Sequence, residues 1–412
     1  MTRSSWSDAR SIAHAAGAAQ RSDVVDTLAL SGALGHVLAA PLVSPIAIPH
    51  YASSAMDGWA VAGVGPWTLL TGGDAERARS VGLGDGVAVD VLTGGLIPAG
   101  AEAVLQLEHG VVEQSAGSAR LHLAPSAPSE EPRPGRHIRP AGTESPAGST
   151  VLDAGTRLGP VHLAVAAGAG FDRVPVVPTP RVRLVLTGDE VVTSGVPAPG
   201  FVRDSFGPSL PGVIASLGGV VTSSVRVGDD ASTTADALGL TSAVGAPARH
   251  QRDLVVTTGG TGDSRADHVR ALLRDAGADF LVDGVDVRPG GPALLARLPD
   301  GRLFVGLPGN PLAALLSVLT LVHPVLAGFQ GLELPALRPA VLASPVDGAR
   351  SGTVLRPYRS VHDADSPTPH AEPTPWHGAA MLRGLADADG VLVCPGSGTA
   401  AGGLVPSLDL PW

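Results

Sequence analysis

The alternation of apolar and polar positions divides the chain into a first half of short elements and a second half of strands and helices. Residues 1–45 are rich in alanine and predict helical structure, which ends in a turn-like stretch over 41–49. Residues 52–123 instead hold short apolar runs separated by Gly and Asp, a pattern typical of a small β-rich domain. The runs that predict strands are Trp59–Val61, Trp67–Leu70, Val87–Leu92 and Ala103–Leu107.

From about residue 180 the pattern changes, and apolar strands alternate with helices. Strands are predicted over Arg181–Leu186, Val220–Val227, Asp253–Thr257 and Leu303–Gly306. Helices are predicted over Leu210–Leu217, over Ser232–Ala243 with Ser232 as the cap, over Arg265–Ala276, and from Pro311 onward. This alternation predicts a doubly wound α/β domain, whose parallel sheet is covered on both faces and binds ligands beyond the carboxyl ends of its strands.

The last part of the chain, residues 331–412, returns to short strands such as Val391–Cys394 and predicts a C-terminal β domain. Just before it, the stretch from 303 to 330 contains no Asp, Glu, Lys or Arg. Prolines interrupt this stretch and leave an apolar core of about a dozen residues, fewer than the ~20 that span a bilayer. We therefore predict a buried helix here and no membrane partner.

Composition adds constraints on charge and redox state. The formal net charge is −10, whereas a protein built to bind nucleic acid needs a basic surface, so nucleic acid is not an expected partner. Cys394 is the only cysteine, which excludes an internal disulfide and a cysteine-based zinc site. Residues 1–20 lack the apolar segment of a signal peptide, and we therefore expect a cytoplasmic protein.

Five glycine-rich or acidic turns lie at the strand ends of the α/β region. They are Thr187–Glu190, Gly228–Asp230, Thr257–Asp263, Pro289–Pro292 and Gly306–Pro311. Glycines let the backbone approach a phosphate, and carboxylates at neighbouring strand ends hold hard cations such as Mg²⁺. The residues alone leave two interpretations open, a site for a phosphorylated ligand with a divalent metal and a set of ordinary turns and helix caps.

Together with the first half of the chain, these turns resemble the molybdopterin molybdenumtransferase family, the molybdenum insertases that include the gephyrin E domain. Ser53–Val61 is similar to the family signature N-S-A-M-D-G-Y-A-V, with Ser for Asn and Trp for Tyr. Thr93–Ala101 matches T-G-x-x-x-P-x-G-A, and Arg139–Glu144 matches R-x-x-G-x-[DE]. The T-G-D-E turn at 187–190 and the G-L-P-G-N-P turn at 306–311 also match, and the matches follow the family order.

The resemblance implies a multidomain protein of α/β and β domains. An elongated linking domain would comprise residues 1–45 with 146–178, and a β-rich domain residues 46–145. An α/β doubly wound molybdopterin-binding domain would follow over 179–330, and a C-terminal β domain over 331–412. The implied quaternary structure is a homodimer, in which the α/β domain of one subunit and the β-rich domain of the other form the active cleft.

The implied reaction inserts molybdate into the dithiolene of adenylylated molybdopterin and releases AMP, with Mg²⁺ assisting. By resemblance, Asp57, Thr93, Glu190 and Asp229 would be catalytic, and Glu190 and Asp229 would bind metal together with Asp267. The implied substrate-binding residues are Thr187, Gly188, Gly259, Gly260, Arg288, Gly309, Asn310 and Arg359. Other proteins of molybdenum cofactor biosynthesis would be further partners.

Several of these residues also have a purely structural interpretation. Asp57 could cap a turn, Thr93 could be a turn hydroxyl, and Arg359 could be a solvated strand arginine. Asn310 is the only asparagine in the chain, and an asparagine suits a turn with positive φ, where glycine would serve equally.

Three departures from the family pattern fall in the expected ligand pocket. The K-P-G-K-P segment appears as Arg288–Pro292, so arginine replaces the first lysine and the charge of the second is lost at Gly291. The G-G-V-S-V-G turn gains the carboxylate of Asp263, which would repel phosphate unless it is metal-bound or protonated. The D-[ST]-N segment carries Phe206 in place of its asparagine. These departures mark a divergent member of the family.

Three functional hypotheses therefore stand beside one another. The first is an active molybdenum insertase, and the second is a non-catalytic or altered-specificity molybdopterin-binding paralogue. The third is a nucleotide-processing enzyme that shares only the α/β domain, against which the Asp57 motif argues. The sequence does not distinguish molybdate from tungstate as the substrate, because the two oxyanions have the same shape and charge.

Overall fold

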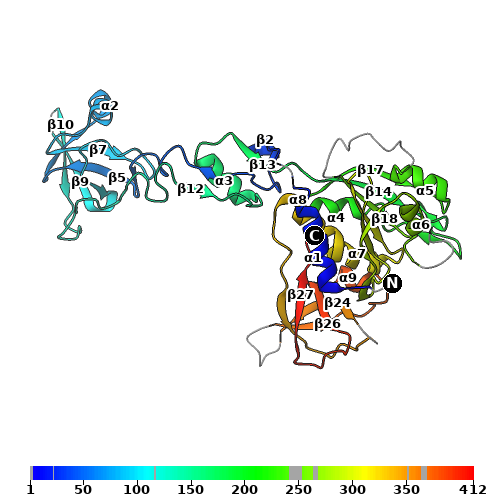
Figure 1. Cartoon of the computed structure of the whole chain (residues 1–412). Helices are drawn as coiled ribbons and strands as arrows, with labels where there is room; N and C mark the ends of the chain where they lie inside the picture. The colour runs from blue at the N-terminus through cyan, green and yellow to red at the C-terminus, as the bar shows by residue number, and fades with distance from the viewer. Residues whose placement is uncertain are drawn as a thin grey trace. The chain divides into compact units, whose positions relative to one another are not determined.

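A computed structural model describes most of the chain as two compact units (Figure 1). The described residues are 3–21, 23–115, 117–240, 253–262, 268–349, 352–362 and 369–412. Unit 1 comprises Met1–Asp26 and Val177–Trp412, and unit 2 comprises Thr27–Val176. The α/β and β fold class predicted from the sequence is confirmed.

A six-stranded sheet with the strand order β8-β5-β7-β6-β10-β9 forms much of unit 2. Its strands are β5 (Gly58–Ala62), β6 (Trp67–Leu70), β7 (Val87–Val91), β8 (Ala103–Gln106), β9 (Gly110–Ser115) and β10 (Ser118–Leu123). The four strands predicted here are thus present. The helix α2 (Gly72–Val81) was not predicted, because it buries only Ala75 and Ala78 and shows no apolar stripe.

The remainder of unit 2 is held together by pairs of short strands. β13 (Arg173–Val176) pairs with β2 (Asp26–Ala29), β12 (Thr150–Leu152) pairs with β3 (Leu42–Val43), and β11 (Ile138–Arg139) pairs with β4 (Ser53–Ser54). The 3-10 turn η1 (Leu30–Gly32) and helix α3 (Pro160–Gly168) complete it. Leu38, Leu42, Leu158 and Val174 are buried in one small core, so the two separate chain segments fold together.

The N-terminal helix lies within unit 1. α1 (Trp6–Ala18) begins at the cap Ser5, and the residues after it up to 45 are mainly strands and turns rather than the predicted helix. Trp6 is buried, and its Nε1 donates to Thr320 Oγ1 at 3.1 Å. The apolar face of α1 therefore finds its partner late in the chain, which local periodicity cannot reveal.

The α/β part of unit 1 is a six-stranded sheet in the order β17-β14-β18-β22-β21-β19. β17 (Val220–Arg226), β14 (Arg181–Leu186), β18 (Asp253–Thr258) and β22 (Leu303–Leu307) run parallel, as predicted. β21 (Leu294–Arg297) and β19 (Asp279–Asp283) extend the sheet with antiparallel strands. Buried clusters lie around Leu184 and Val256 and around Val185 and Val255, because successive side chains point to opposite faces.

The helices of this part are α4 (Leu210–Ser216), α5 (Ala231–Leu238) and α6 (Val269–Asp275). Asp230 rather than Ser232 caps α5, because its Oδ2 accepts the Thr233 N–H at 2.8 Å and the Ser232 hydroxyl at 2.7 Å. The bond from the Thr233 N–H is the main reason that the pKa of Asp230 is lowered. Residues 241–243 and 265–267 of the two predicted helices lie outside the described residues.

The apolar stretch forms one continuous helix of 20 residues, Pro311–Gln330, made of α7 (Pro311–Ser317), the π-helical η3 (Val318–Val322) and α8 (His323–Gln330). Pro324 does not end the helix, because it falls at the first turn of α8, directly after the π-helical turn. The helix is long and apolar enough to cross a membrane, but 89% of its most apolar window is buried inside the structure.

The sheet in the C-terminal region also contains strands from earlier in the chain. β24 (Thr353–Val361), β26 (Gly390–Pro395), β27 (Leu404–Asp409), β23 (Arg338–Val341) and β25 (His370–Pro373) come from residues 331–412. β20 (Val285–Arg288) and β1 (Ser4–Ser5) join them through parallel pairing. The predicted C-terminal β region is therefore not formed from its own residues alone.

The close crossing of α1 and α8 generates a stability prediction. A Cβ at Gly328 would lie 2.6 Å from the Ala18 backbone nitrogen, so Gly328→Ala is expected to lower the free energy of unfolding by about 1–3 kcal/mol. Gly212→Ala, in the open on α4, is expected to raise it by up to about 1 kcal/mol. Urea denaturation followed by circular dichroism measures both, and equal effects of the two variants would contradict the packing argument.

Candidate functional site

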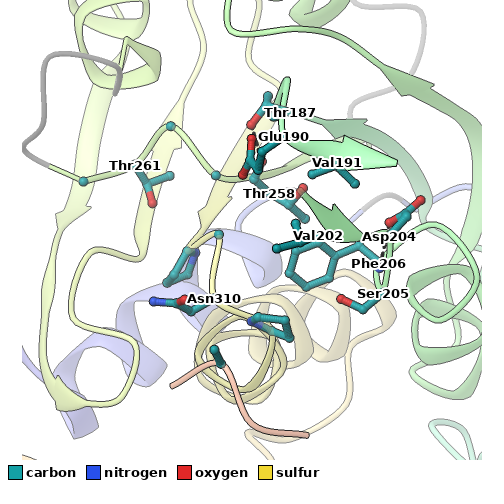
Figure 2. Close-up of a pocket in the computed structure, with 18 of the residues that line it drawn as sticks. Thr187, Glu190, Val191, Val202, Asp204, Ser205, Phe206, Thr258, Thr261 and Asn310 are labelled. Carbon is teal, nitrogen blue, oxygen red and sulfur yellow. Dashed lines mark hydrogen bonds between the residues drawn. The ribbon is translucent and has the colours of Figure 1, made fainter. Parts of the chain in front are cut away.

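A cavity of about 720 Å³ lies in unit 1 at the carboxyl ends of the parallel strands (Figure 2). The strand ends of β14, β18 and β22 are adjacent in the sheet, so the turns that follow them meet at one edge. Eight of the predicted site residues line this cavity, namely Thr187, Gly188, Glu190, Asp229, Gly259, Gly260, Gly309 and Asn310. The structure thus brings together most of the α/β-domain residues that the sequence singled out.

Thr187 and Gly259 connect two of the turns. The Thr187 hydroxyl donates to the Thr258 carbonyl at 2.6 Å, and both threonines are buried. Gly259 has a φ of +82°, and a Cβ there would lie 2.7 Å from Thr187 Oγ1. Its N–H donates to the Leu307 carbonyl at 2.9 Å. Glycine is therefore required at position 259 both by backbone conformation and by the close approach of the neighbouring turn.

Glu190 and Asp229 supply the acidic wall of the cavity. The Asp189 N–H donates to Asp229 Oδ2 at 3.4 Å, which ties the turn after β14 to the turn after β17. Mg²⁺ is commonly bound by one or two carboxylates together with water and substrate phosphates, and this pair fits that donor chemistry. No group of three or more metal-binding side chains occurs among the described residues, and the third predicted ligand, Asp267, lies outside them, as does Asp263.

Another part of the cavity wall is apolar and includes Phe206 of the turn at 204–207. Val191 and Val202 pair in register as the first residues of β15 (Val191–Val192) and β16 (Val202–Arg203). Beside them Figure 2 shows the ring of Phe206, which takes the place of the family asparagine, directed into the cavity.

Asp204 holds that turn in shape. Its Oδ1 accepts the N–H groups of Phe206 and Gly207, each at 3.0 Å, and its Oδ2 pairs with Arg226 at 2.6 Å. Burial alone would raise the pKa of Asp204, but the Gly207 N–H, Arg226 and the Phe206 N–H together lower it. Asp204 therefore remains ionised at neutral pH and anchors the turn.

Asn310 begins α7, and its amide makes no capping hydrogen bond to that helix. Its φ is −73°, so a left-handed turn does not explain the only asparagine of the chain. In Figure 2 the Asn310 amide lies on the far side of the cavity from Glu190. The side chain is thus available to a ligand at the start of the helix, where backbone N–H groups favour an anion.

The loop over 289–292 contributes Pro292 to the cavity wall, and two arginines approach it from other elements. Arg270 of α6 donates to the Pro292 carbonyl at 3.0 Å and to the Thr261 carbonyl at 2.9 Å, and it forms an ion pair with Asp283. Arg3 lies against Gly291, where an added Cβ would be 3.1 Å from its Nη1. A positive charge therefore lies beside Gly291.

Neither Arg288 nor Arg359 lines the cavity. Arg288 is exposed at the end of β20, and Arg359 lies in β24 opposite Glu372 of β25. Their roles as substrate-binding residues stay predictions.

Asp57 and Thr93 lie together in unit 2, although 36 positions separate them in sequence. Asp57 Oδ1 accepts the Thr93 N–H at 2.6 Å and the Thr93 hydroxyl at 2.8 Å. The Thr93 N–H first and its hydroxyl second lower the pKa of Asp57. The carboxylate is exposed and therefore both holds a turn and remains open to solvent, so the structural and the catalytic interpretation are compatible.

Several residues of the site carried no signal in the sequence. Val202, Arg203, Ala380 and Leu382 line the cavity, yet they lie in segments without recognisable turn chemistry. Arg270 is the second residue of α6, and an arginine in a helix is typical of a solvated face. Only the hydrogen bonds of Arg270 to the Thr261 and Pro292 carbonyls distinguish it from a solvated arginine, and the sequence does not predict these contacts.

The Asp57–Thr93 contact leads to a pH prediction. Because the pKa of Asp57 is lowered from 3.8, its ionised form stabilises the folded unit above the unfolded pKa of about 4, and this contribution is lost as the pH falls through the folded pKa. Thr93→Val removes the hydroxyl but keeps the backbone N–H, so we expect the pKa to rise yet stay below 3.8. NMR titration of the carboxyl carbon measures it, with Thr143→Val, whose hydroxyl donates to the Pro140 carbonyl, as the control. An unchanged pKa in Thr93→Val would refute the contact.

The two glycine turns give a matched pair of variants. Gly259→Ala forces an L-residue into positive φ against Thr187 and is expected to lower the free energy of unfolding by at least about 1–2 kcal/mol. Gly309→Ala meets only ordinary contact, 3.7 Å from the Gly259 Cα, and is expected to stay within about 0.5 kcal/mol of the original. Thermal unfolding compares them, and a destabilised Gly309→Ala would count against this geometry.

Two known protein families match consecutive regions of the chain. Residues 4–170 match the MoeA N-terminal region (domain I and II), and residues 183–328 match a probable molybdopterin-binding domain. Molybdopterin molybdenumtransferase 2 of Mycobacterium tuberculosis is 31% identical over 387 residues, which cover 90% of each chain. A molybdopterin molybdenumtransferase of Nostoc is 29% identical over 76% of this chain and 70% of its own.

A solved structure of a molybdopterin biosynthesis MoeA protein from Pyrococcus horikoshii has the same fold, with a TM-score of 0.73 at 21% identity over 99% of this chain and 100% of its own. The resemblance inferred from the S-A-M-D-G and G-L-P-G-N-P segments is thereby confirmed. Two domain matches and a relative above 30% identity over nine tenths of the chain lead to one conclusion: the chain belongs to the molybdopterin molybdenumtransferase (MoeA) family of molybdenum cofactor biosynthesis.

Proposed function

We propose that this protein is a molybdenum insertase, a transferase that inserts molybdate into the dithiolene of adenylylated molybdopterin and releases AMP. The observation that carries the proposal is the meeting of an acidic pair, Glu190 and Asp229, with the glycine turn Gly259–Gly260 around one cavity. Relatives across the whole chain bear the name of this activity.

The dimensions and walls of the cavity support a ligand of this class. A volume of about 720 Å³ falls in the usual range for pockets that hold small molecules. The glycine turns present backbone without side chains, which lets a phosphate approach the turns closely. Arg203, which lines the cavity, adds a positive charge beside the acidic wall.

Glu190 and Asp229 would hold Mg²⁺, which would supply charge neutralisation at the phosphates when bound. Release of AMP requires an oxygen of water to bond to the adenylate phosphorus while the bond from that phosphorus to the bridging oxygen breaks. The pterin phosphate leaves with the bridging oxygen, and the proton of the attacking water passes to solvent. The turns at 187–190 and 258–262 orient the phosphates for this step, because their strands and the bond from Thr187 to Thr258 fix them.

The further elements of the proposal concern assembly and location. We infer a homodimer, in which the Asp57–Thr93 pair of one subunit completes the cavity of the other, and a cytoplasmic enzyme that works with other proteins of cofactor biosynthesis. The pair supports this role because its carboxylate is exposed, ionised and held in one orientation by two hydrogen bonds.

The test is molybdate-dependent release of AMP from adenylylated molybdopterin by the purified protein with Mg²⁺. Glu190→Gln keeps the shape but removes the charge, and we expect the rate to fall on the order of 10²–10³-fold. Asp275→Asn, the same kind of change at the exposed end of α6, is expected to stay within about twofold.

No release of AMP by the unaltered protein, despite binding of the substrate, would overturn the insertase proposal and favour a non-catalytic paralogue. A parallel assay with tungstate reveals whether the two oxyanions are distinguished.

A further inference from the structure

The apolar patch in the cavity wall is formed by Val191, Val202 and Phe206. Val202 is 51% exposed, and Phe206 is only partly buried against the core of unit 1. Contact with water is unfavourable for apolar side chains that line an open cavity. An exposed apolar patch of this kind therefore often marks the place where the apolar surface of a ligand binds. The fold therefore exposes these apolar side chains in a cavity whose wall also carries the charged residues Glu190, Arg203 and Asp229.

The backbone of Phe206 is fixed on both sides. Its N–H donates to Asp204 Oδ1 at 3.0 Å, and its carbonyl accepts the N–H groups of Ser209 and Leu210 at 3.1 and 2.9 Å. Asp204 is itself paired with Arg226 at 2.6 Å. With only two side-chain torsions, a ring on so constrained a backbone loses little conformational entropy when a ligand binds.

The position of the ring completes the geometry. Figure 2 shows the Phe206 ring beside Val202 among the side chains that line the cavity. Part of the ring packs against the hydrophobic core, and the remainder is free to contact a ligand. A flat ring that enters this space can lie in offset contact with the aromatic face.

We propose that Phe206 is a specificity-determining residue that stacks on a flat heteroaromatic ring of the substrate. This inference rests on the proposed function, since an adenylylated pterin brings two such rings, the pterin and the adenine. The chemistry common to both is a planar nitrogen heterocycle. Every such ring offers a face to an aromatic side chain, and removal of a stacking partner typically weakens binding by about five- to 150-fold.

The experiment measures the affinity of the protein for molybdopterin and for AMP separately, by isothermal titration. Phe206→Leu keeps the apolar volume but removes the aromatic face. We expect it to weaken binding of one of the two probes by at least about tenfold and to leave the other within about twofold. The affected probe identifies the ring that lies on Phe206.

Two variants separate stacking from packing. Phe206→Tyr retains the aromatic face and is expected to bind both probes within about threefold of the unaltered protein. Phe280→Leu makes the matched change at a partly buried ring of β19 that does not line the cavity, and we expect neither affinity to change. Circular dichroism and thermal unfolding of each variant verify that its fold is retained.

Unchanged affinity for both probes in a folded Phe206→Leu would overturn the stacking role and leave the proposed function intact. Equal weakening of both probes would overturn it as well, because it would indicate a general distortion of the cavity. Failure of the unaltered protein to bind either probe would overturn the proposed function, and the role of Phe206 with it.

Discussion

The parallel registration of β14, β18 and β22 is the constraint on which the site depends. It places Leu186, Thr258 and Leu307 level at one edge of the sheet, so the turns that follow start from the same plane. Hydrogen bonds continue past the strand ends, from Thr187 to Thr258 and from Gly259 to Leu307. The hydrogen bonds to the strand ends therefore hold the glycine turns rigidly against the sheet. The same turns position the acidic residues beside them.

The elements with strong local patterns were predictable from the sequence. The four parallel strands and the strands of the β-rich region show apolar runs bounded by turn residues, and the cavity residues from the glycine turns followed from their motifs. The cap of α5 was misassigned to Ser232 because Asp230, two residues earlier, has the same capping chemistry and sits where the strand-to-helix turn requires it.

Other features depend on contacts between segments that are distant in the chain, and the local sequence pattern does not predict them. Nothing near Trp6 indicates that it donates to Thr320, and nothing near Val285 indicates a parallel pairing with the first strand of the chain. The position of Arg3 beside Gly291 is the same kind of feature, because the two residues are nearly three hundred positions apart in the chain.

The placement of α1 has a consequence for how the chain acquires its structure during synthesis. The helix is synthesised well before Thr320, the hydrogen-bond partner of Trp6, which lies 314 positions later. Unit 2 can complete its own core in the interval, while the apolar face of α1 stays without its partner. The apolar face of α1 therefore cannot be covered by its native partner until the chain has been made through residue 320.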